Sequence, residues 1–230
     1  MAKVPVFVAM DMTELAQVEA LAVQFSPHVA GVKLGLEFFN AHGREGVARV
    51  AAQGVPVFLD LKLHDIPNTV EKAVRSLAGL PVVLLTIHAS GGSEMIRRAV
   101  LGAREALGPE AKVIAVTVLT SLDAADVQAI GFAQGPLEQA VRLAMLAKDA
   151  GAHGVVCSPL EIAAIRAACG QDFVLVVPGI RPEGSDAADQ KRSMTPKAAL
   201  DAGATYLVIG RPITGAAKPV EAAAAIAASL

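Results

Sequence analysis

Eight short apolar segments recur along the chain, and each is followed by a turn and then by an alanine-rich stretch with helical spacing. The first four begin about 26 residues apart, which is roughly the length of one strand–loop–helix–loop unit. Most of the segments are continuously apolar rather than alternating, as is typical of parallel strands covered on both faces. The predicted strands are Val4–Met10, Ala30–Gly35, Pro56–Lys62, Val82–Ala89, Lys112–Leu119, Gly154–Ser158, Phe173–Gly179 and Thr205–Gly210.

Helices are predicted between these strands, and glycines such as Gly54, Gly108 and Gly170 follow their carboxyl ends. Eight strand–helix units in 230 residues favour a (β/α)8 barrel over an open, doubly wound sheet, because barrels of about 200–250 residues commonly form one unit. No linker divides the chain, so we expect an α/β fold, a TIM barrel with a single domain over residues 1–230. The open sheet is the alternative. The predicted helices are Glu14–Gln24, Glu37–Gln53, Thr69–Leu77, Ser93–Leu107, Pro136–Ala150, Leu160–Cys169, Pro196–Ala202 and Val220–Ala228.

The composition argues against three classes of protein. With 53% hydrophobic and 18% charged residues, the chain can bury a large core, which argues against disorder. Its 20 Lys+Arg and 22 Asp+Glu give a net charge of −2, and 3% of residues are aromatic, so no nucleic-acid partner is expected. The longest uncharged stretch, residues 76–93, contains Gly79 and Pro81, which would break a spanning helix, so no membrane partner is expected either.

The two cysteines and the amino terminus both favour a cytoplasmic location. Cys157 and Cys169 are too few for a disulfide framework or a metal knuckle, and we interpret them as free thiols in a reducing compartment. The segment from Met1 to Pro5 leads directly into a strand, without the basic and apolar regions of a signal peptide.

Charged residues gather where the first three predicted strands end. The period of two along a strand puts Asp60 and Lys62 on one face, which in a barrel points inward at the carboxyl-terminal mouth. Lys33 ends the second strand and Asp11 follows the first, so these charges converge on the rim where barrel enzymes carry out their chemistry. Because an unpaired buried charge is costly, we expect an alternating, neutralising array of Lys33, Asp60, Lys62 and Asp65.

Structural explanations for the same residues stay open. Asp60 and Lys62 would also suit an ion pair that caps a strand. His64, in a turn beside Asp65, and His88, at the end of the fourth strand, are interpreted as structural rather than catalytic. No histidine is paired with Asp or Glu at metal-ligand spacing, so no metal is predicted.

Two glycine–arginine placements follow the last two strands. Gly179 and Arg181 come after the seventh strand, and Gly210 and Arg211 after the eighth, where barrels usually bind phosphate. Glycine allows close backbone approach and arginine offers a bidentate contact to an oxyanion. Gln190, in the intervening loop, is a further candidate donor. The alternative is that both arginines are solvated loop charges.

Taken together, these motifs resemble the orotidine 5′-phosphate decarboxylase family over nearly the whole chain. That family's Asp-x-Lys-x-x-Asp-Ile-Pro-Asn-Thr motif is present without departure from Asp60 to Thr69. It is specific in combination with the motifs near the carboxyl end, whereas Asp-x-Lys-x-x-Asp alone also occurs in sugar-phosphate decarboxylases of the same superfamily. The other matching segments are Asp11, Gly31–Lys33, His88–Gly92, Val116–Ser121, Pro178–Arg181, Asp189–Arg192 and Ile209–Ile213.

The resemblance implies a decarboxylation of orotidine 5′-monophosphate to uridine 5′-monophosphate, in de novo pyrimidine biosynthesis, without metal or cofactor. It implies that Lys62 protonates the carbanion formed at C6, that Asp60 lies beside the substrate carboxylate, and that Lys33 completes the charge array. An ammonium group at C6 suits this chemistry, because it both stabilises the negative charge and supplies the proton.

The resemblance also implies the binding residues. Asp11 and Lys33 would contact ribose hydroxyls, and Thr120 would hydrogen-bond the pyrimidine. A homodimer is implied, in which Asp65 and Thr69 reach into the neighbouring subunit's site. The implied phosphate ligands are Arg181, Gln190, Gly210 and Arg211.

Two other functions stay open at this point. A Mg²⁺-dependent 3-keto sugar-phosphate decarboxylase would share the barrel and the residues Asp60, Lys62 and Asp65, but residues 66–69 fit it poorly. A non-catalytic nucleotide-binding barrel would keep the phosphate ligands, yet it has no reason to bury Asp60 beside Lys62.

Overall fold

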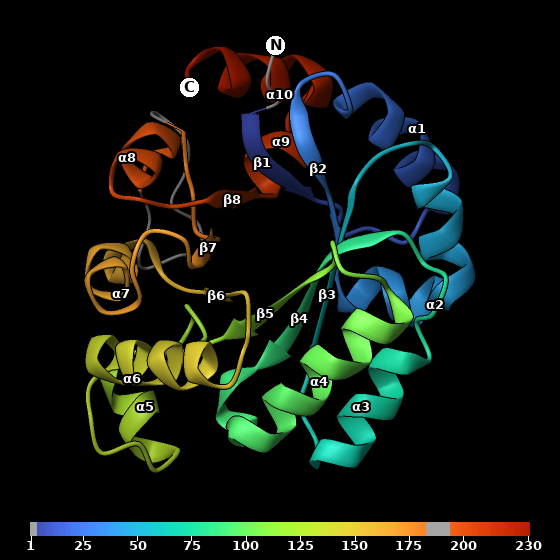
Figure 1. Ribbon diagram of the computed structural model, residues 1–230. Coiled ribbons are helices and arrows are strands. Elements are labelled where there is room, and N and C mark those ends of the chain that lie inside the picture. Colours follow the sequence, from blue (N-terminus) through green and yellow to red (C-terminus); the bar gives the residue numbers. More distant parts are fainter. Residues whose placement is uncertain (1–3, 183–193) are drawn as a thin grey trace.

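Eight parallel strands close into a barrel in chain order in the computed structural model, which describes residues 4–182 and 194–230 (Figure 1). The pairing of β1 with β8, with Val6 opposite Leu207, completes the closure. The predicted (β/α)8 barrel is therefore confirmed, and the open sheet is wrong. The strands are β1 (Val4–Ala9), β2 (Val29–Leu34), β3 (Val57–Leu63), β4 (Val82–His88), β5 (Lys112–Val116), β6 (Gly154–Val156), β7 (Val174–Val177) and β8 (Tyr206–Ile209).

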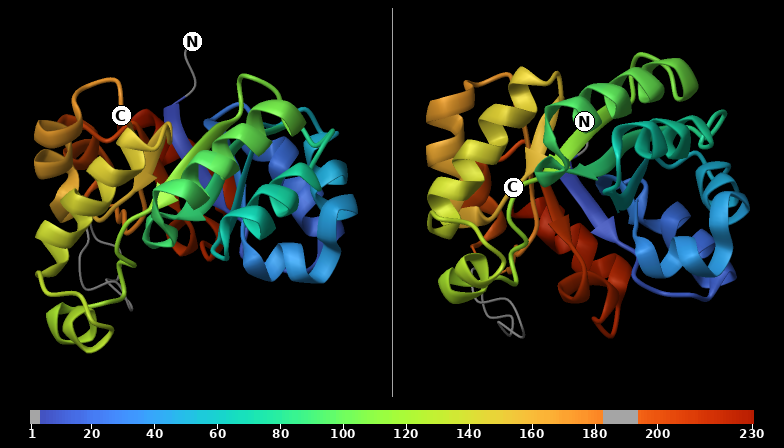
Figure 2. Two further views of the ribbon diagram at one scale, coloured as in Figure 1. Left: turned by 60° about the horizontal axis from the view of Figure 1, so that its bottom comes forward. Right: turned by 90° about the horizontal axis from the view of Figure 1, so that it is seen from below.

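Helices form a ring around the barrel, as expected when every strand is followed by a crossover on the outside (Figures 1 and 2). Two short 3₁₀ turns, Ala89–Gly91 and Pro159–Glu161, precede α4 and α7. The helices are α1 (Leu15–Phe25), α2 (Leu36–Ala51), α3 (Pro67–Arg75), α4 (Gly92–Ala106), α5 (Ala124–Ala129), α6 (Pro136–Asp149), α7 (Ile162–Cys169), α8 (Pro196–Asp201), α9 (Arg211–Thr214) and α10 (Pro219–Ala228).

The connection after β5 differs most from the sequence prediction. The strand ends at Val116 rather than Leu119, and α5 was not predicted. Asp123 and Asp126 start this helix with a reciprocal capping box, in which each carboxylate accepts a backbone N–H of the other residue. The connection carrying α5 projects from the barrel (Figure 2), and it brings Val118, Leu119 and Thr120 to the mouth.

Two apolar layers hold the fold together. The larger lies between the strands and the helices. The smaller fills the barrel interior, where Phe7 packs edge-on against Phe58 and Tyr206, with ring centroids 5.6 and 5.3 Å apart. Val176 and Val208 belong to this inner layer and also line the cavity at the mouth. The interior is thus a packed core whose upper surface is the floor of that cavity.

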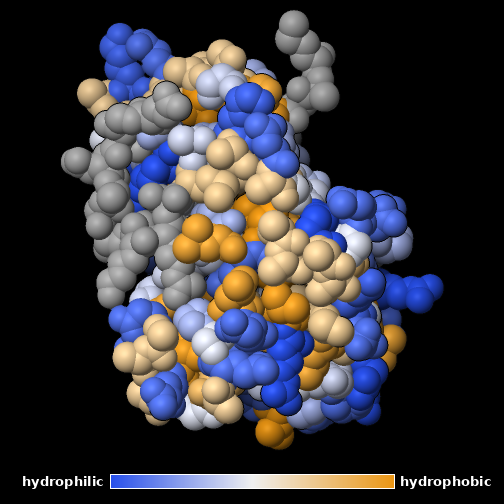
Figure 3. Space-filling model, turned by 90° about the vertical axis from the view of Figure 1, so that its left-hand side faces the viewer, coloured by the Kyte–Doolittle hydropathy of each residue, from blue (hydrophilic) through white to orange (hydrophobic). Residues whose placement is uncertain are grey.

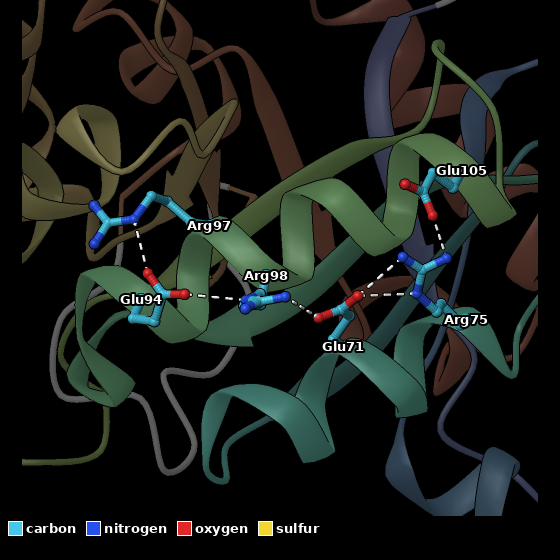
Figure 4. Close-up of polar contacts among 6 residues, drawn as sticks. All are labelled: Glu71, Arg75, Glu94, Arg97, Arg98 and Glu105. Atoms are coloured by element: carbon cyan, nitrogen blue, oxygen red, sulfur yellow. Dashed lines mark hydrogen bonds and ion pairs between the residues drawn. The ribbon is translucent and has the colours of Figure 1, made fainter.

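An exposed network of ion pairs joins α3 to α4 (Figure 4). Glu71 contacts Arg75 at 2.9 Å and Arg98 at 3.0 Å, and Arg98 also contacts Glu94 at 3.0 Å. Arg97 pairs with Glu94 and Arg75 with Glu105 at the two ends of the network. Solvent screens such pairs, so we attribute little stability to them.

The surface on the α6–α8 side mixes polar and apolar patches (Figure 3). Its exposed apolar side chains include Leu137 and Met145 of α6. Within residues 4–182 and 194–230, no helix is both long and apolar enough to cross a membrane.

Candidate functional site

Four charged side chains alternate in sign at the carboxyl ends of β1, β2 and β3. The Lys62 ammonium lies 2.8 Å from Asp60 Oδ2, and the Lys33 ammonium lies 3.4 Å from the same oxygen. Lys33 also donates to Asp11 Oδ1 at 3.2 Å. Within one chain the order is therefore Asp11–Lys33–Asp60–Lys62, and the expected place of Asp65 in the array stays a prediction.

The two inner members of this array are buried, whereas the outer two reach solvent. The side chains of Lys33 and Asp60 are each 10% exposed, compared with 30% for Lys62 and 55% for Asp11. Burial alone would raise the pKa of Asp60, but the charges of Lys33 and Lys62, with hydrogen bonds from Lys62 and Thr86, lower it below its ordinary value. Asp60 is therefore an anion at neutral pH, held between two cations.

A cavity of about 190 Å³ opens beside this array. Lys33, Asp60 and Lys62 form its charged wall, and Thr120 supplies a hydroxyl. The rest of the lining is almost entirely apolar, so charges at the wall are poorly screened. The apolar lining residues are Phe58, Val116, Val118, Leu119, Val156, Val176, Pro178 and Val208.

Gly35 keeps the space beside the array free. A Cβ atom at this position would lie 3.0 Å from Lys33 Nζ and 3.3 Å from Asp11 Oδ1. Because both neighbours are polar atoms of the array, a larger residue would push them apart. Gly35, directly after β2, thus leaves the ends of these two side chains undisturbed.

Lys62 has an unusual backbone. Its φ angle of 49° is the only positive one at a non-glycine residue in the described part of the chain. This left-handed conformation costs on the order of 1–3 kcal/mol, and it is held by the surrounding structure. The sequence contains no sign of it, because lysine has no preference for this conformation.

Asp65 and Thr69 lie apart from the cavity within one chain. Asp65 lies on the connection from β3 to α3 and Thr69 in the first turn of α3; both are exposed, and neither lines the cavity. Asp65 Oδ1 accepts the backbone N–H of Ile66 at 2.6 Å, and Ile66 itself is 66% exposed. Their predicted role in a neighbouring subunit's site stays a prediction.

The two arginines stand beyond the ends of β7 and β8. Arg181 follows Pro178, which lines the cavity, and its backbone N–H donates to Met194 at 3.0 Å. Arg211 is the first residue of α9, directly after Gly210. Both therefore belong to the same mouth as the charged array. Gln190 lies outside the described residues.

His64 and His88 form a pair near the array, with ring centroids 5.3 Å apart. Burial lowers the pKa of His88, and the charges of His64 and Lys62 lower it further against the opposing effect of Asp60. Neither ring lines the cavity. Their interpretation as structural residues stays a prediction.

The arrangement can stabilise and quench negative charge. The Lys62 ammonium has three N–H donors and borders a small, mostly apolar cavity, where it can both stabilise a carbanion and supply a proton. Among residues 4–182 and 194–230, no three or more His, Cys, Asp or Glu side chains are grouped so as to hold a metal ion.

Comparisons with known proteins point to one family. The family model described as "Orotidine 5′-phosphate decarboxylase / HUMPS family" matches residues 5–226. The orotidine 5′-phosphate decarboxylase of Paramagnetospirillum magneticum is 54% identical over 231 residues, with 98% of each chain covered. That of Novosphingobium aromaticivorans is 52% identical over 226 residues, covering 98% of this chain and 99% of its own. The crystal structure of orotidine 5′-phosphate decarboxylase from Lactobacillus acidophilus has a TM-score of 0.83 at 39% identity, with 96% of both chains covered.

Proposed function

The chain belongs to the orotidine 5′-phosphate decarboxylase / HUMPS family, and from this premise we propose that the cavity beside Lys62 is where the substrate loses CO₂. The protein decarboxylates orotidine 5′-monophosphate to uridine 5′-monophosphate, a step of pyrimidine biosynthesis. The observation that carries the site assignment is the contact of the Lys62 ammonium with the buried Asp60 carboxylate at the wall of that cavity.

Lys62 acts as the proton donor. The C6–carboxyl bond breaks and leaves its electron pair on C6, in the plane of the pyrimidine ring, where the π system cannot delocalise it. A proton from Lys62 Nζ then forms the new C6–H bond, and the neutral amine regains its proton from solvent. A unit charge pair at about 4 Å contributes roughly 4 kcal/mol at an effective dielectric near 20. This attraction is too small to account for the rate acceleration of an enzyme by itself, so binding energy from the rest of the substrate must also lower the barrier.

The other members of the array orient the substrate. Asp60 lies beside the departing carboxylate, and Lys33 completes the charge array and contacts the ribose together with Asp11. The 3.2 Å contact of Lys33 with Asp11 and its 3.4 Å contact with Asp60 support this placement. Thr120, which also lines the cavity, hydrogen-bonds the polar edge of the pyrimidine.

The phosphate is held by Arg181, Gln190, Gly210 and Arg211. The places of Arg181 and Arg211 after β7 and β8, beside the cavity lining, support this assignment. Arg211→Ala should lower kcat/KM for the phosphorylated substrate by about 10²- to 10³-fold, and that for the unphosphorylated nucleoside by less than about threefold. Equal losses for both would remove Arg211 from the phosphate site.

The working unit is a homodimer that shares its sites. The exposure of Asp65 and Thr69 and of the apolar Ile66 between them supports this proposal, because a partner subunit would cover Ile66 and receive Asp65. Mixing Lys62→Ala with Asp65→Ala subunits should restore activity to about one quarter of the wild-type level, since half of the dimers are mixed and each has one intact site. No recovery in verified mixed dimers would contradict the sharing.

The reaction needs neither metal nor cofactor and takes place in the cytoplasm. The free, buried thiols of Cys157 and Cys169 support the location. Release of CO₂ from carboxyl-labelled orotidine 5′-monophosphate, measured with and without EDTA, tests the metal-free activity. We expect equal rates. Activity that disappears in EDTA and returns with Mg²⁺ would contradict the proposal and favour the metal-dependent sugar-phosphate chemistry.

A further inference from the structure

The pairing of β3 with β4 slips at the segment that carries Asp60 and Lys62. Leu59 lies opposite Leu85, but the next aligned pair is Leu63 with Ile87. Between these pairs β3 advances by four residues and β4 by two, so the ladder is interrupted over Asp60–Lys62. A bulge of this kind bends the strand and redirects its side chains, and such bulges are frequent beside active sites. The left-handed backbone of Lys62 falls inside it.

Thr86, on β4, fills the interruption with its side chain. Its hydroxyl accepts the backbone N–H of Lys62 at 2.9 Å and donates to Asp60 Oδ1 at 2.8 Å. A threonine hydroxyl has one proton to donate and lone pairs to accept, so both contacts form at once. Thr86 is fully buried and does not line the cavity, so it has no surface to offer to a ligand.

The hydrogen bond from Thr86 gives the two oxygens of the Asp60 carboxylate different partners. Oδ1 is taken by Thr86, which leaves Oδ2 for the ammonium groups of Lys62 and Lys33. The same hydroxyl fixes the backbone of the residue that carries the proposed proton donor. One buried side chain therefore sets both the rotation of the carboxylate and the direction in which Lys62 leaves the strand.

We propose that Thr86 is a positioning residue for the decarboxylation. Its hydroxyl holds the Lys62 backbone and the Asp60 carboxylate in the geometry that the reaction requires. The inference rests on the proposed function of Lys62 and Asp60, and it adds a residue that contacts neither the cavity nor the substrate. A hydrogen bond to a buried carboxylate also favours its ionised form. The charged and titratable groups that face Asp60 are Lys33 from β2, Lys62 from β3 and His88 from β4.

The experiment compares Thr86→Val with Thr86→Ser. Valine keeps the shape and removes the hydroxyl, and we expect kcat to fall by about 10- to 100-fold with KM little changed, because a hydrogen bond to a charged group is lost. Serine keeps the hydroxyl, and we expect it to restore kcat to within about threefold of wild type. Equal losses of kcat per folded molecule in both variants would overturn the proposal.

A second readout separates positioning from a merely structural role. The Asp60 carboxyl, followed by ¹³C NMR in the ligand-free protein, should titrate at higher pH in Thr86→Val than in wild type or Thr86→Ser. A structural role would lower the midpoint of thermal unfolding and leave this titration unmoved, which would also overturn the proposal. If Thr86→Val does not fold, Thr86→Cys takes its place with the same expected direction, because a thiol is a weak donor and acceptor.

Thr117 offers the matched control. It is also a buried threonine at the carboxyl end of a strand, and its hydroxyl donates to the Val156 carbonyl at 2.9 Å instead of to the charged array. Thr117→Val should leave the Asp60 titration unchanged, and an equal shift in this variant would contradict the specific role of Thr86. Because the titration needs no substrate, it tests Thr86 independently. Failure of wild-type protein to release CO₂ would instead defeat the proposed function.

Discussion

The barrel buries charge at both of its ends, and the two sites are built in opposite ways. At the carboxyl ends of the strands, Asp60 shares one oxygen between two ammonium groups at the wall of a cavity. At the amino ends of β7 and β8, the buried guanidinium of Arg166 has only neutral acceptors among its described partners, at 2.6–3.1 Å. These acceptors are the carbonyl oxygens of Gly170, Gln171, Phe173 and Gly203 and the hydroxyl of Thr205.

The Arg166 site uses its charge to hold backbone together. Its guanidinium ties the segment that enters β7 to the segment that enters β8, and Thr205 continues the link by accepting the backbone N–H of Leu175 at 3.0 Å. This tie adds to a short pairing of β7 with β8, whose registered pairs are Val176 with Tyr206 and Val177 with Leu207. The N–H donors of the Arg166 guanidinium are therefore all used in hydrogen bonds within the protein.

The difference shows that burial alone does not mark a functional charge. Lys62 lies beside a cavity, it has a strained backbone, and among the described residues its ammonium has one close acceptor for three donors. Arg166 has no such remaining capacity. In a barrel of this kind the carboxyl-terminal face carries chemistry and the amino-terminal face carries stability.

The largest effect on turnover is expected at the carboxyl-terminal end of the barrel, where Lys62 lies. Lys62→Ala should lower kcat by at least about 10⁴-fold, because the proposed proton donor, which is also the cation proposed to lie beside the carbanion, is lost. Binding of uridine 5′-monophosphate, measured by calorimetry, and the unfolding midpoint should stay close to wild type. Lys72→Ala, at an exposed position of α3, is the control and should keep full activity. Turnover of Lys62→Ala near the wild-type level would contradict a catalytic role for the charge at this end of the barrel.

An effect of intermediate size, on stability rather than on turnover, is expected at the amino-terminal end of the barrel. Arg166→Met should destabilise the fold by about 3 kcal/mol, which lowers the unfolding midpoint by about 6–12 °C in a chain of this size, because several buried carbonyls lose their donor. Its kcat per folded molecule should stay within about threefold of wild type. A large loss of kcat in a fully folded Arg166→Met would mean that the two ends are coupled.

The smallest effect is expected on the surface. Glu94→Gln removes a carboxylate that contacts both Arg97 and Arg98 in the exposed network of Figure 4, and solvent screens these contacts. We expect no measurable change in the unfolding midpoint or in kcat. A clear drop in the midpoint would show that the network on α3 and α4 contributes more than its exposure implies.

Much of the fold was predictable because its signal is local. Eight apolar runs predicted eight strands, and the structure has all of them, although β5 ends before Leu119. The convergence of Lys33, Asp60 and Lys62 followed from strand periodicity and the shared rim of a barrel. The short helices α5 and α9 were missed, because segments of six and four residues carry too little periodicity to detect.

What escaped prediction depends on pairing between distant strands. One example is the register shift between β3 and β4, together with the left-handed backbone of Lys62 inside it. The register of two strands depends on both of them, so it cannot be predicted from the sequence of either segment alone. Thr86 and Arg166 looked like an ordinary strand residue and an ordinary helix residue, and their roles appear only once their partners are in place. The contact of Lys33 with Asp11 likewise appears only in the folded chain, because it joins the ends of two different strands.

A crystal structure of the protein with uridine 5′-monophosphate tests the central claim most directly. The proposed mechanism requires Lys62 Nζ within about 3.5 Å of C6, the distance from which a proton can be delivered, with the pyrimidine in the cavity and the phosphate at Arg211. Such a complex would support Lys62 as the donor. A nucleotide bound with C6 far from Lys62, or an ammonium directed into bulk solvent, would contradict it.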